Sequence, residues 1–164
     1  MNLIIKNWLI LLFTISLIAI ISALTAEYFF DLAPCKMCLK QRYSYYAIII
    51  LILFFYFFGK INNIFLFILI ELSILYGLFY AIWHVGIEQK ILKGPASCSG
   101  ELSNTNSIEN LKEQINNQSI INCNDITWSI LNLSAATINS ILLLLILIIN
   151  SIYILKKFYA QKKI

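Results

Sequence analysis

Two cysteines at the entrance of an apolar run have the spacing of a reversible disulfide. They lie in the segment Pro34-Cys35-Lys36-Met37-Cys38. A Cys-x-x-Cys pair can close a small disulfide and reopen it, so it can carry two electrons. Arg42 follows Cys38 by four residues, so a helix that begins here would stack thiol and guanidinium on one face. Because the helix N-terminus and the cation both favour the thiolate, the pattern predicts a reactive thiolate at the edge of a bilayer. Such a thiolate is suited to chemistry with a molecule dissolved in the membrane.

The other two cysteines, Cys98 and Cys123, lie in a long polar segment. Gly94-Pro95 is a turn signal just before Cys98 and predicts an exposed, bent backbone there. Four cysteines outside the apolar runs indicate two disulfides, with three possible pairings. The alternative to a redox role is that both disulfides are purely structural. We expect no metal, because Cys98 and Cys123 are far apart without a nearby histidine, and Leu39 stands where haem attachment requires histidine.

The elements that must position these cysteines are membrane-spanning helices. The chain has 164 residues, of which 60% are hydrophobic and 12% are charged, whereas a soluble domain carries about 25% charged residues. Apolar blocks at about 8–24, 39–58, 64–83 and 135–155 are close to the roughly 20 residues that a crossing needs. We interpret the first block as a span and not as a signal peptide. We therefore expect an all-α membrane protein, a four-helix transmembrane bundle that forms a single domain over 1–164.

Charge sets the expected orientation of this bundle. Four crossings place both termini and the 59–63 loop on one side, and loops 25–38 and 84–134 on the other. The side with the termini carries six of the twelve basic residues and no acid: Lys6, Lys60, Lys156, Lys157, Lys162 and Lys163. Because short basic flanks stay in the cytoplasm, we expect cytoplasmic termini and outward-facing cysteine loops. The net charge of +4 is then a topology signal and gives no reason to expect nucleic-acid binding.

A few polar residues in the spans are candidates for chemistry or for helix packing. His84, the one histidine, stands at the outer end of the third span. It is either an interfacial histidine with a satisfied hydrogen bond or a proton donor or acceptor near a bound quinone. Glu71 lies at mid-span, where a carboxyl is costly unless protonated or partnered. We expect it to make an interhelical hydrogen bond. The cluster of Tyr43, Tyr45 and Tyr46 fits an interfacial aromatic belt.

An ordered set of motifs over nearly the whole chain resembles the family of disulfide bond formation protein B (DsbB), a bacterial inner-membrane quinone reductase. The motifs are Pro34-Cys35-Lys36-Met37-Cys38 with Gln41-Arg42, His84-Val85-Gly86-Ile87-Glu88, Gly94-Pro95-Ala96-Ser97-Cys98, Cys123 ahead of Trp128, and Asn132-Leu133-Ser134-Ala135 through Asn139. A Cys-x-x-Cys pair alone would be weak evidence. The ordered set on a four-span topology is specific.

The resemblance implies an electron path through all four cysteines. Cys98 would be attacked by a reduced DsbA-like periplasmic oxidase of the thioredoxin fold, which frees Cys123. Cys123 would attack Cys35 and release Cys38 as a thiolate. Cys38 would pass electrons to a ubiquinone or menaquinone, and Arg42 would stabilise the negative charge. The resemblance also implies a multi-pass protein of the bacterial inner membrane, with cytoplasmic termini and periplasmic cysteine loops.

Two other classes of protein compete with this reading. Quinone reductases related to vitamin K epoxide reductase also have four reactive cysteines in a four-helix bundle. In that family the two loop cysteines precede the Cys-x-x-Cys pair in the sequence, whereas here Cys35 and Cys38 come first. This order argues against membership of that family. The second alternative is a membrane scaffold without enzymatic activity, held by two structural disulfides. Such a scaffold would need neither a quinone nor Arg42 beside Cys38.

Overall fold

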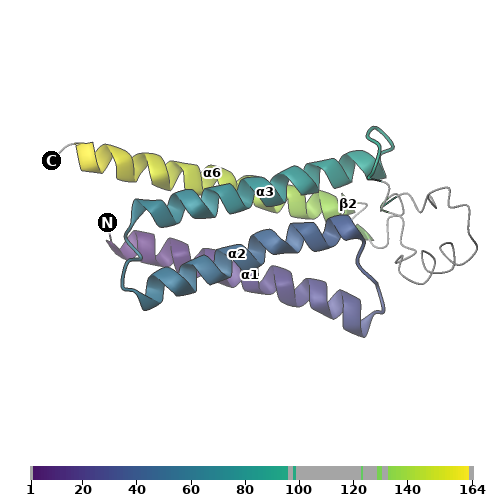
Figure 1. Cartoon of the computed structure of the whole chain (residues 1–164), viewed down its shortest axis with the longest axis horizontal. Helices are drawn as coiled ribbons and strands as arrows, with labels where there is room; N and C mark the ends of the chain where they lie inside the picture. Colours follow the sequence, from purple (N-terminus) through teal and green to yellow (C-terminus); the bar gives the residue numbers. More distant parts are fainter. Residues whose placement is uncertain (1, 96–97, 99–122, 124–128, 131–132, 163–164) are drawn as a thin grey trace, which may run out of the picture.

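Four long helices lie side by side and form a bundle in the computed structural model (Figure 1). They are α1 (Asn2–Phe29), α2 (Lys36–Phe57), α3 (Ile64–Glu88) and α6 (Ala135–Lys162). The structure describes residues 2–95, 98, 123, 129–130 and 133–162. All four helices are long and apolar enough to cross a membrane, so the chain is a multi-pass membrane protein. The expected four-helix bundle is confirmed.

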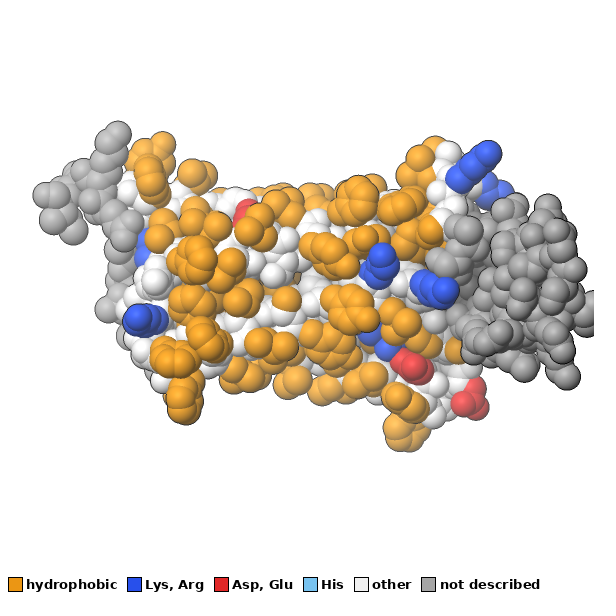
Figure 2. Space-filling view, viewed as in Figure 1, with side chains coloured by type: hydrophobic (Ala, Val, Ile, Leu, Met, Phe, Trp, Pro, Cys, Tyr) orange, Lys and Arg blue, Asp and Glu red, His pale blue; other side chains and the backbone are white. Residues whose placement is uncertain are grey.

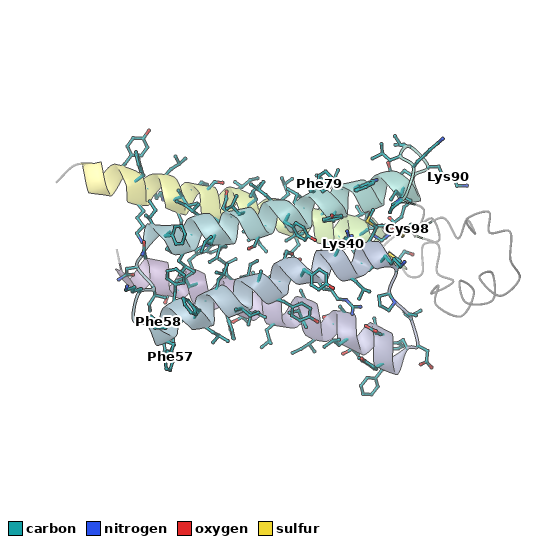
Figure 3. All side chains as sticks on the ribbon, viewed as in Figure 1. Lys40, Phe57, Phe58, Phe79, Lys90 and Cys98 are labelled. Carbon is teal, nitrogen blue, oxygen red and sulfur yellow. A yellow bond between two sulfur atoms is a disulfide. The ribbon has the colours of Figure 1, made fainter. Side chains whose placement is uncertain are left out.

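The two chain termini lie at one end of the bundle, and Cys98 lies at the other (Figures 1 and 3), where the other three cysteines pack with it. We call the latter the cysteine end, defined by Cys35, Cys38, Cys98 and Cys123. Two short antiparallel strands precede α6 there, β1 (Ser129–Ile130) and β2 (Leu133–Ser134), with Ser129 opposite Ser134. Most of the expected loop between α3 and α6 lies outside the described residues.

The helices begin and end at residues that satisfy the free backbone groups. Cys35 is the N-cap of α2, and its sulfur accepts from the Cys38 backbone N–H at 3.3 Å. Asn63 is the N-cap of α3 and accepts from the Phe65 N–H at 3.0 Å. Between α2 and α3, Gly59 adopts a φ of 64°, a left-handed conformation that favours glycine. The third helix continues past His84 to Glu88, so the imidazole projects from a helix and not from a loop.

The outer surface of the bundle is apolar, as contact with lipid requires. Figure 2 shows hydrophobic side chains over most of the described face. Among them, Ile50, Phe57 and Phe79 are each more than half exposed. Inside, α2 and α3 approach closely at Gly77, where an added Cβ would lie 2.4 Å from the Ser44 hydroxyl. This close approach brings the sulfurs of α2 near the imidazole of α3.

A second polar cluster lies away from the cysteine end and holds Glu71. One of its carboxylate oxygens accepts from the Asn150 amide at 2.6 Å, and the other accepts from the Ser151 hydroxyl. Asn150 itself is fully buried, and it also accepts from the Trp8 indole at 3.3 Å. Glu71 therefore joins α3 to α6, and the expected interhelical hydrogen bond is confirmed.

Candidate active site

All four cysteines meet in one cluster at the cysteine end. Cys98 and Cys123 form a disulfide, whereas Cys35 and Cys38 are thiols with their sulfur atoms 3.1 Å apart. The sulfurs of Cys35 and Cys123 and a ring nitrogen of His84 all lie within 4.8 Å of one another. The two cysteine pairs are therefore close enough for thiol–disulfide exchange after small movements.

Cys98 is only 2% exposed, which differs from the exposed position that the turn signal suggested. The Gly94-Pro95 turn does precede it, and the Cys98 N–H donates to the Pro95 carbonyl at 2.7 Å. However, Cys98 packs in a small apolar cluster with Met37 and Ile87. The turn therefore directs the cysteine inward, and a partner thiol can reach Cys98 only after this contact opens.

In this dithiol state the negative charge is stabilised on Cys35. Its sulfur accepts from the Cys38 thiol at 3.1 Å and from the Cys38 backbone N–H at 3.3 Å, at the N-terminus of α2. Hydrogen bonding from the Cys38 thiol, together with His84, outweighs burial and lowers the pKa of Cys35 to about 4. The spacing of Cys38 and Arg42 predicts the thiolate at Cys38, because helical spacing alone does not identify Cys35 as the capping residue.

His84 lies between the sulfurs of Cys35 and Cys38 and the polar side chains of Gln41 and Glu88. Its Nε2 is 3.6 Å from the Cys35 sulfur and 3.8 Å from a Glu88 carboxylate oxygen. Its Nδ1 is 4.0 Å from the Cys38 sulfur and 3.1 Å from the Gln41 amide nitrogen. The side chain is buried, with 6% of its surface exposed. The imidazole is therefore the group that contacts both members of the Cys-x-x-Cys pair.

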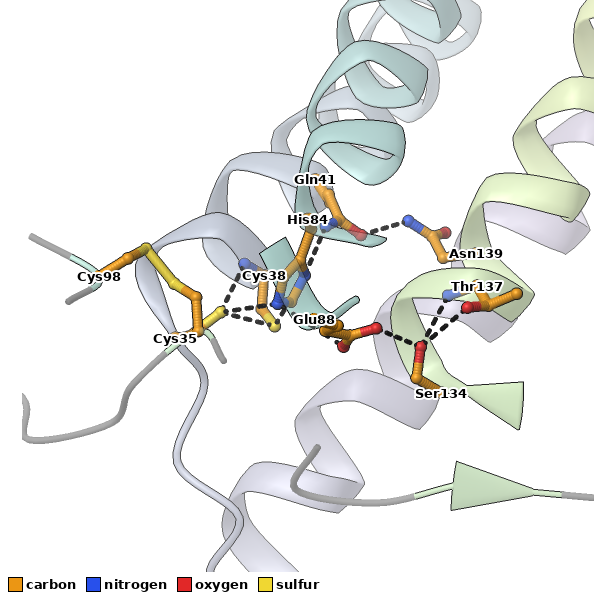
Figure 4. A network of polar contacts seen from close by, with 10 residues as sticks. Cys35, Cys38, Gln41, His84, Glu88, Cys98, Ser134, Thr137 and Asn139 are labelled. Carbon is orange, nitrogen blue, oxygen red and sulfur yellow. Dashed lines mark hydrogen bonds and ion pairs between the residues drawn. A yellow bond between two sulfur atoms is a disulfide. The ribbon is translucent and has the colours of Figure 1, made fainter. Parts of the chain in front are cut away.

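Two polar branches extend from this imidazole to α6 (Figure 4). On one branch, the Asn139 amide donates to Gln41 at 2.6 Å, and the Tyr45 hydroxyl donates to Asn139 at 2.5 Å. On the other branch, the Ser134 hydroxyl donates to Glu88 at 2.5 Å. Ser134 also accepts from the Thr137 backbone N–H at 3.2 Å, so it caps the start of α6. The position of His84 therefore depends on α2 and α6 as well as on α3.

The Arg42 guanidinium is paired with a residue of α1. Its Nη1 lies 2.5 Å from a Glu27 carboxylate oxygen, and its Nη2 donates to the Ala23 carbonyl at 3.3 Å. Within the described part of the chain, none of its hydrogen bonds goes to Cys38. Arg42 and Cys38 line the same cavity, as expected for residues on one face of α2. The hydrogen-bonded partner of the guanidinium is a carboxylate of α1, which the spacing within α2 does not reveal.

A cavity of about 240 Å³ opens beside these groups between α1, α2 and α6. Both Cys-x-x-Cys sulfurs reach it, and so do Arg42 and His84. Small and apolar residues form much of its remaining wall: Ala19, Ile20, Ala23, Ala26, Leu32, Ala135, Ala136, Ile138 and Leu142. An apolar pocket with a few convergent polar groups is typical of small-molecule sites, although this one is smaller than the usual range of about 300–1,000 Å³.

The cluster of Cys35, His84 and Cys123 has the proximity of a metal site but lacks the ligands for one. Metal-binding cysteines act as thiolates, and the Cys123 sulfur is already bonded to Cys98. Two ligands then remain in the cluster, whereas a structural zinc site uses four. We assign no metal to these residues.

Sequence reasoning missed the partners that orient the site. The sequence pattern does not point to Glu27, it places Tyr45 in an aromatic belt, and it gives Gln41 and Asn139 only as motif positions. The available signal was their polarity, because polar residues inside membrane helices are costly unless they are partnered. Identifying the partners requires knowing which faces of the helices meet.

Comparison with known proteins identifies one family and one relative. The model of the family described as "Disulfide bond formation protein DsbB" matches residues 5–153. An uncharacterized protein of Rickettsia prowazekii (strain Madrid E) is 30% identical over 141 residues, which cover 85% of this chain and 81% of that protein. No solved structure matches the chain.

Proposed function

The chain belongs to the DsbB family of disulfide bond formation proteins, and on this premise we propose that it is a thiol:quinone oxidoreductase. Its reaction is the reoxidation of a DsbA-like periplasmic dithiol oxidase, which supports disulfide formation in exported proteins. The observation that carries the proposal is the position of Cys35. Its sulfur lies within 4.8 Å of Cys123 and also borders the cavity.

The electron path begins at the Cys98–Cys123 disulfide. A partner thiolate attacks the Cys98 sulfur, forms a mixed disulfide and releases Cys123 as a thiolate. Cys123 then attacks Cys35 of an oxidised Cys35–Cys38 pair, and Cys38 leaves as a thiolate. The second partner thiol attacks the mixed disulfide, which oxidises the partner and frees Cys98. Each step exchanges one disulfide for another, so two electrons move inward without a free radical.

The final exchange restores the loop disulfide. The Cys98 thiolate attacks Cys123 in the Cys35–Cys123 bond, and Cys35 leaves as a thiolate. The result is a Cys98–Cys123 disulfide with Cys35 and Cys38 as thiols, which is the state that the structure describes. The hydrogen bonds at the N-terminus of α2 stabilise the Cys35 thiolate produced in this step. The described state therefore corresponds to the enzyme before the Cys35–Cys38 pair is reoxidised.

The cavity fits a quinone ring in its chemistry. Its apolar walls suit a membrane-dissolved ring, the Arg42 guanidinium offers polar contacts to the ring oxygens, and His84 borders the same cavity. When bound, a quinone supplies the oxidising power, since it accepts two electrons and two protons. Cys38 borders the cavity together with Cys35, so both sulfurs are in position to close their disulfide. We propose ubiquinone or menaquinone as the cofactor.

We propose the bacterial inner membrane as the location, with cytoplasmic termini and the cysteine end in the periplasm. The support is the basic character of the end that holds the termini, where Lys60 lies between α2 and α3 and Lys156 and Lys157 lie in the C-terminal part of α6. Disulfide chemistry also belongs in an oxidising compartment.

Trapping the partner tests the proposal. In Cys123→Ser, Cys98 is a free thiol that can attack the disulfide of the oxidised partner, which forms a mixed disulfide and releases one partner thiol. Because the neighbouring Cys123 is absent, no loop thiol displaces the partner, and the mixed disulfide should be captured by acid quenching and identified by mass spectrometry. The control is Cys98→Ser, which should trap no DsbA-like protein through this route. Equal capture by both variants, or none by either, would favour a scaffold held by structural disulfides.

A further inference from the structure

Four polar side chains from three helices form one continuous hydrogen-bonded chain behind the active site. The Tyr45 hydroxyl donates to the Asn139 carbonyl oxygen at 2.5 Å, and the Asn139 amide donates to the Gln41 carbonyl oxygen at 2.6 Å. The Gln41 amide then contacts Nδ1 of His84 at 3.1 Å. Each amide accepts on one side and donates on the other, so the chain as a whole has a direction.

The tyrosine end determines that direction. Tyr45 is 4% exposed, and its hydroxyl carries a single proton that needs an acceptor. Within the described residues, its hydrogen-bond partner is Asn139. If both side-chain amides were flipped, so that oxygen and nitrogen exchanged places, Asn139 would present its nitrogen to Tyr45. The buried hydroxyl proton would then lose this acceptor. A buried donor without an acceptor is destabilising, so the observed direction is the stable one.

The histidine end favours the same direction. Nε2 of His84 faces the Cys35 sulfur at 3.6 Å and a Glu88 oxygen at 3.8 Å, and both groups are acceptors when ionised. Nδ1 faces the donating amide of Gln41. The ionisable groups facing His84 are Cys35 and Cys38 at the start of α2 and Glu88 on α3, and Arg42 lines the same cavity. Of the two neutral tautomers, both ends therefore favour the one with the proton on Nε2.

We propose that Asn139 and Gln41 are positioning residues that hold His84 as the neutral Nε2–H tautomer, with its proton directed at the Cys35 sulfur. In this role His84 is a hydrogen-bond donor that stabilises the Cys35 thiolate, and no proton is transferred along the chain. The side-chain amides of Asn139 and Gln41 do not ionise near neutral pH. The Tyr45–Asn139–Gln41 chain therefore orients the imidazole without conducting protons. In a neutral imidazole, a side chain that donates a hydrogen bond to one ring nitrogen leaves the proton on the other nitrogen.

The inference rests on the proposed function only in treating Cys35 as a redox thiol. The tautomer can be measured without a partner protein or a quinone. A failure of the tautomer assignment would leave the electron path intact, and a failure of the electron path would leave the tautomer measurable.

Nitrogen NMR of labelled histidine tests the assignment directly. The sequence contains one histidine, so ¹⁵N-histidine labelling of the full chain in lipid nanodiscs reports on His84 alone. With Cys35 and Cys38 reduced, we expect a protonated Nε2 and an unprotonated Nδ1. Asn139→Leu should give a mixture of tautomers. An Nδ1–H tautomer in the unmodified protein, or an unchanged spectrum in Asn139→Leu, would overturn the proposal.

Two further variants separate orientation from folding. Asn150→Leu makes the same substitution at a buried position of the same helix and removes bonds to Glu71 and Trp8, so its His84 spectrum should match the unmodified protein. Tyr45→Phe removes one oxygen, keeps both amides and frees Asn139 to turn over. It should therefore also give mixed tautomers. If Asn139→Leu does not fold, Tyr45→Phe carries the test, and an unchanged tautomer there would contradict the proposal.

The ionisation of Cys35 gives an independent readout. In a Cys38→Ser background the serine hydroxyl still donates, and Cys35 is the single free thiol while Cys98 and Cys123 stay bonded. The pH profile of its alkylation by a small reagent gives its apparent pKa. Adding Asn139→Leu should raise this apparent pKa by about 1. At a pH well below the pKa, the fraction of Cys35 present as thiolate should then be roughly tenfold smaller. Adding Asn150→Leu should leave it unchanged. No shift in Asn139→Leu would contradict the proposed role.

Discussion

The sulfur of Cys35, at the N-terminus of α2, lies within 4.8 Å of the sulfur of Cys123. Cys123 belongs to the segment between α3 and α6. This distance joins two cysteine pairs that are far apart in sequence. Cys123 is bonded to Cys98, and Cys35 is stabilised as a thiolate. One disulfide and one dithiol therefore meet at the two sulfurs that an internal exchange would join.

Removing Cys38 should trap that exchange. In Cys38→Ser, Cys35 cannot close its own disulfide. Reduced partner attacks Cys98 and releases the Cys123 thiolate, and an added two-electron oxidant such as diamide then joins Cys123 to Cys35, so a Cys35–Cys123 bond should accumulate. Peptide mapping by mass spectrometry measures it. The double variant Cys38→Ser/Cys123→Ser is the control and should lack the bond. A Cys35–Cys98 bond as the main product would contradict the proposed order of steps.

The low pKa of Cys35 predicts how the reduced protein responds to acid. Because the folded-state pKa is about 4 and the ordinary thiol value is 9.0, the thiolate contributes stability that is full above pH 9. This contribution declines as the pH falls and is lost below about 4. Reduced protein should therefore lose more stability between pH 8 and pH 5 than Cys35→Ser, as measured by thermal unfolding in detergent. Parallel pH profiles for the two proteins would contradict the assignment.

The fold was predictable because apolar block length is a local property of the sequence. The four helices follow from it, and so does the placement of all cysteines at one end. The orientation of Arg42 was not predictable in the same way, because Glu27 belongs to another helix. Likewise, the turn before Cys98 was visible in the sequence, but its inward direction depends on packing against Ile87. Residues on one helix can be related by spacing, whereas contacts between helices require the packed structure.

The Arg42–Glu27 pair predicts a defect in quinone use. Arg42→Ala removes a cation from the cavity and leaves a half-buried carboxylate unpaired, so the quinone concentration for half-maximal turnover should rise about tenfold. Thiol exchange with the partner should change little. Lys40→Ala is a matched control, since this base of α2 is exposed and contacts Tyr80 outside the cavity. Equal quinone dependence in both variants would reject a cofactor-binding role for Arg42.

Glu71 should matter for stability and not for turnover. Its carboxylate joins α3 to α6 through Asn150 and Ser151, away from the cysteines. Glu71→Leu leaves the buried Asn150 amide without this acceptor and should cost about 1–3 kcal/mol of stability. Glu71→Gln keeps one acceptor and should cost less. Quinone reduction by the folded Glu71→Gln protein should remain within about twofold of the unmodified rate. A complete loss of turnover in that variant would instead indicate a proton path through Glu71.

The central claim is that electrons from a partner dithiol pass through Cys35 and Cys38 to a quinone. The most direct measurement follows quinone reduction by absorbance while a reduced DsbA-like oxidase is added to the purified protein. We predict about one quinone reduced for each partner disulfide formed, and no quinone reduction in Cys35→Ser or Cys38→Ser. Undiminished quinone-coupled oxidation of the partner in Cys35→Ser would contradict the account.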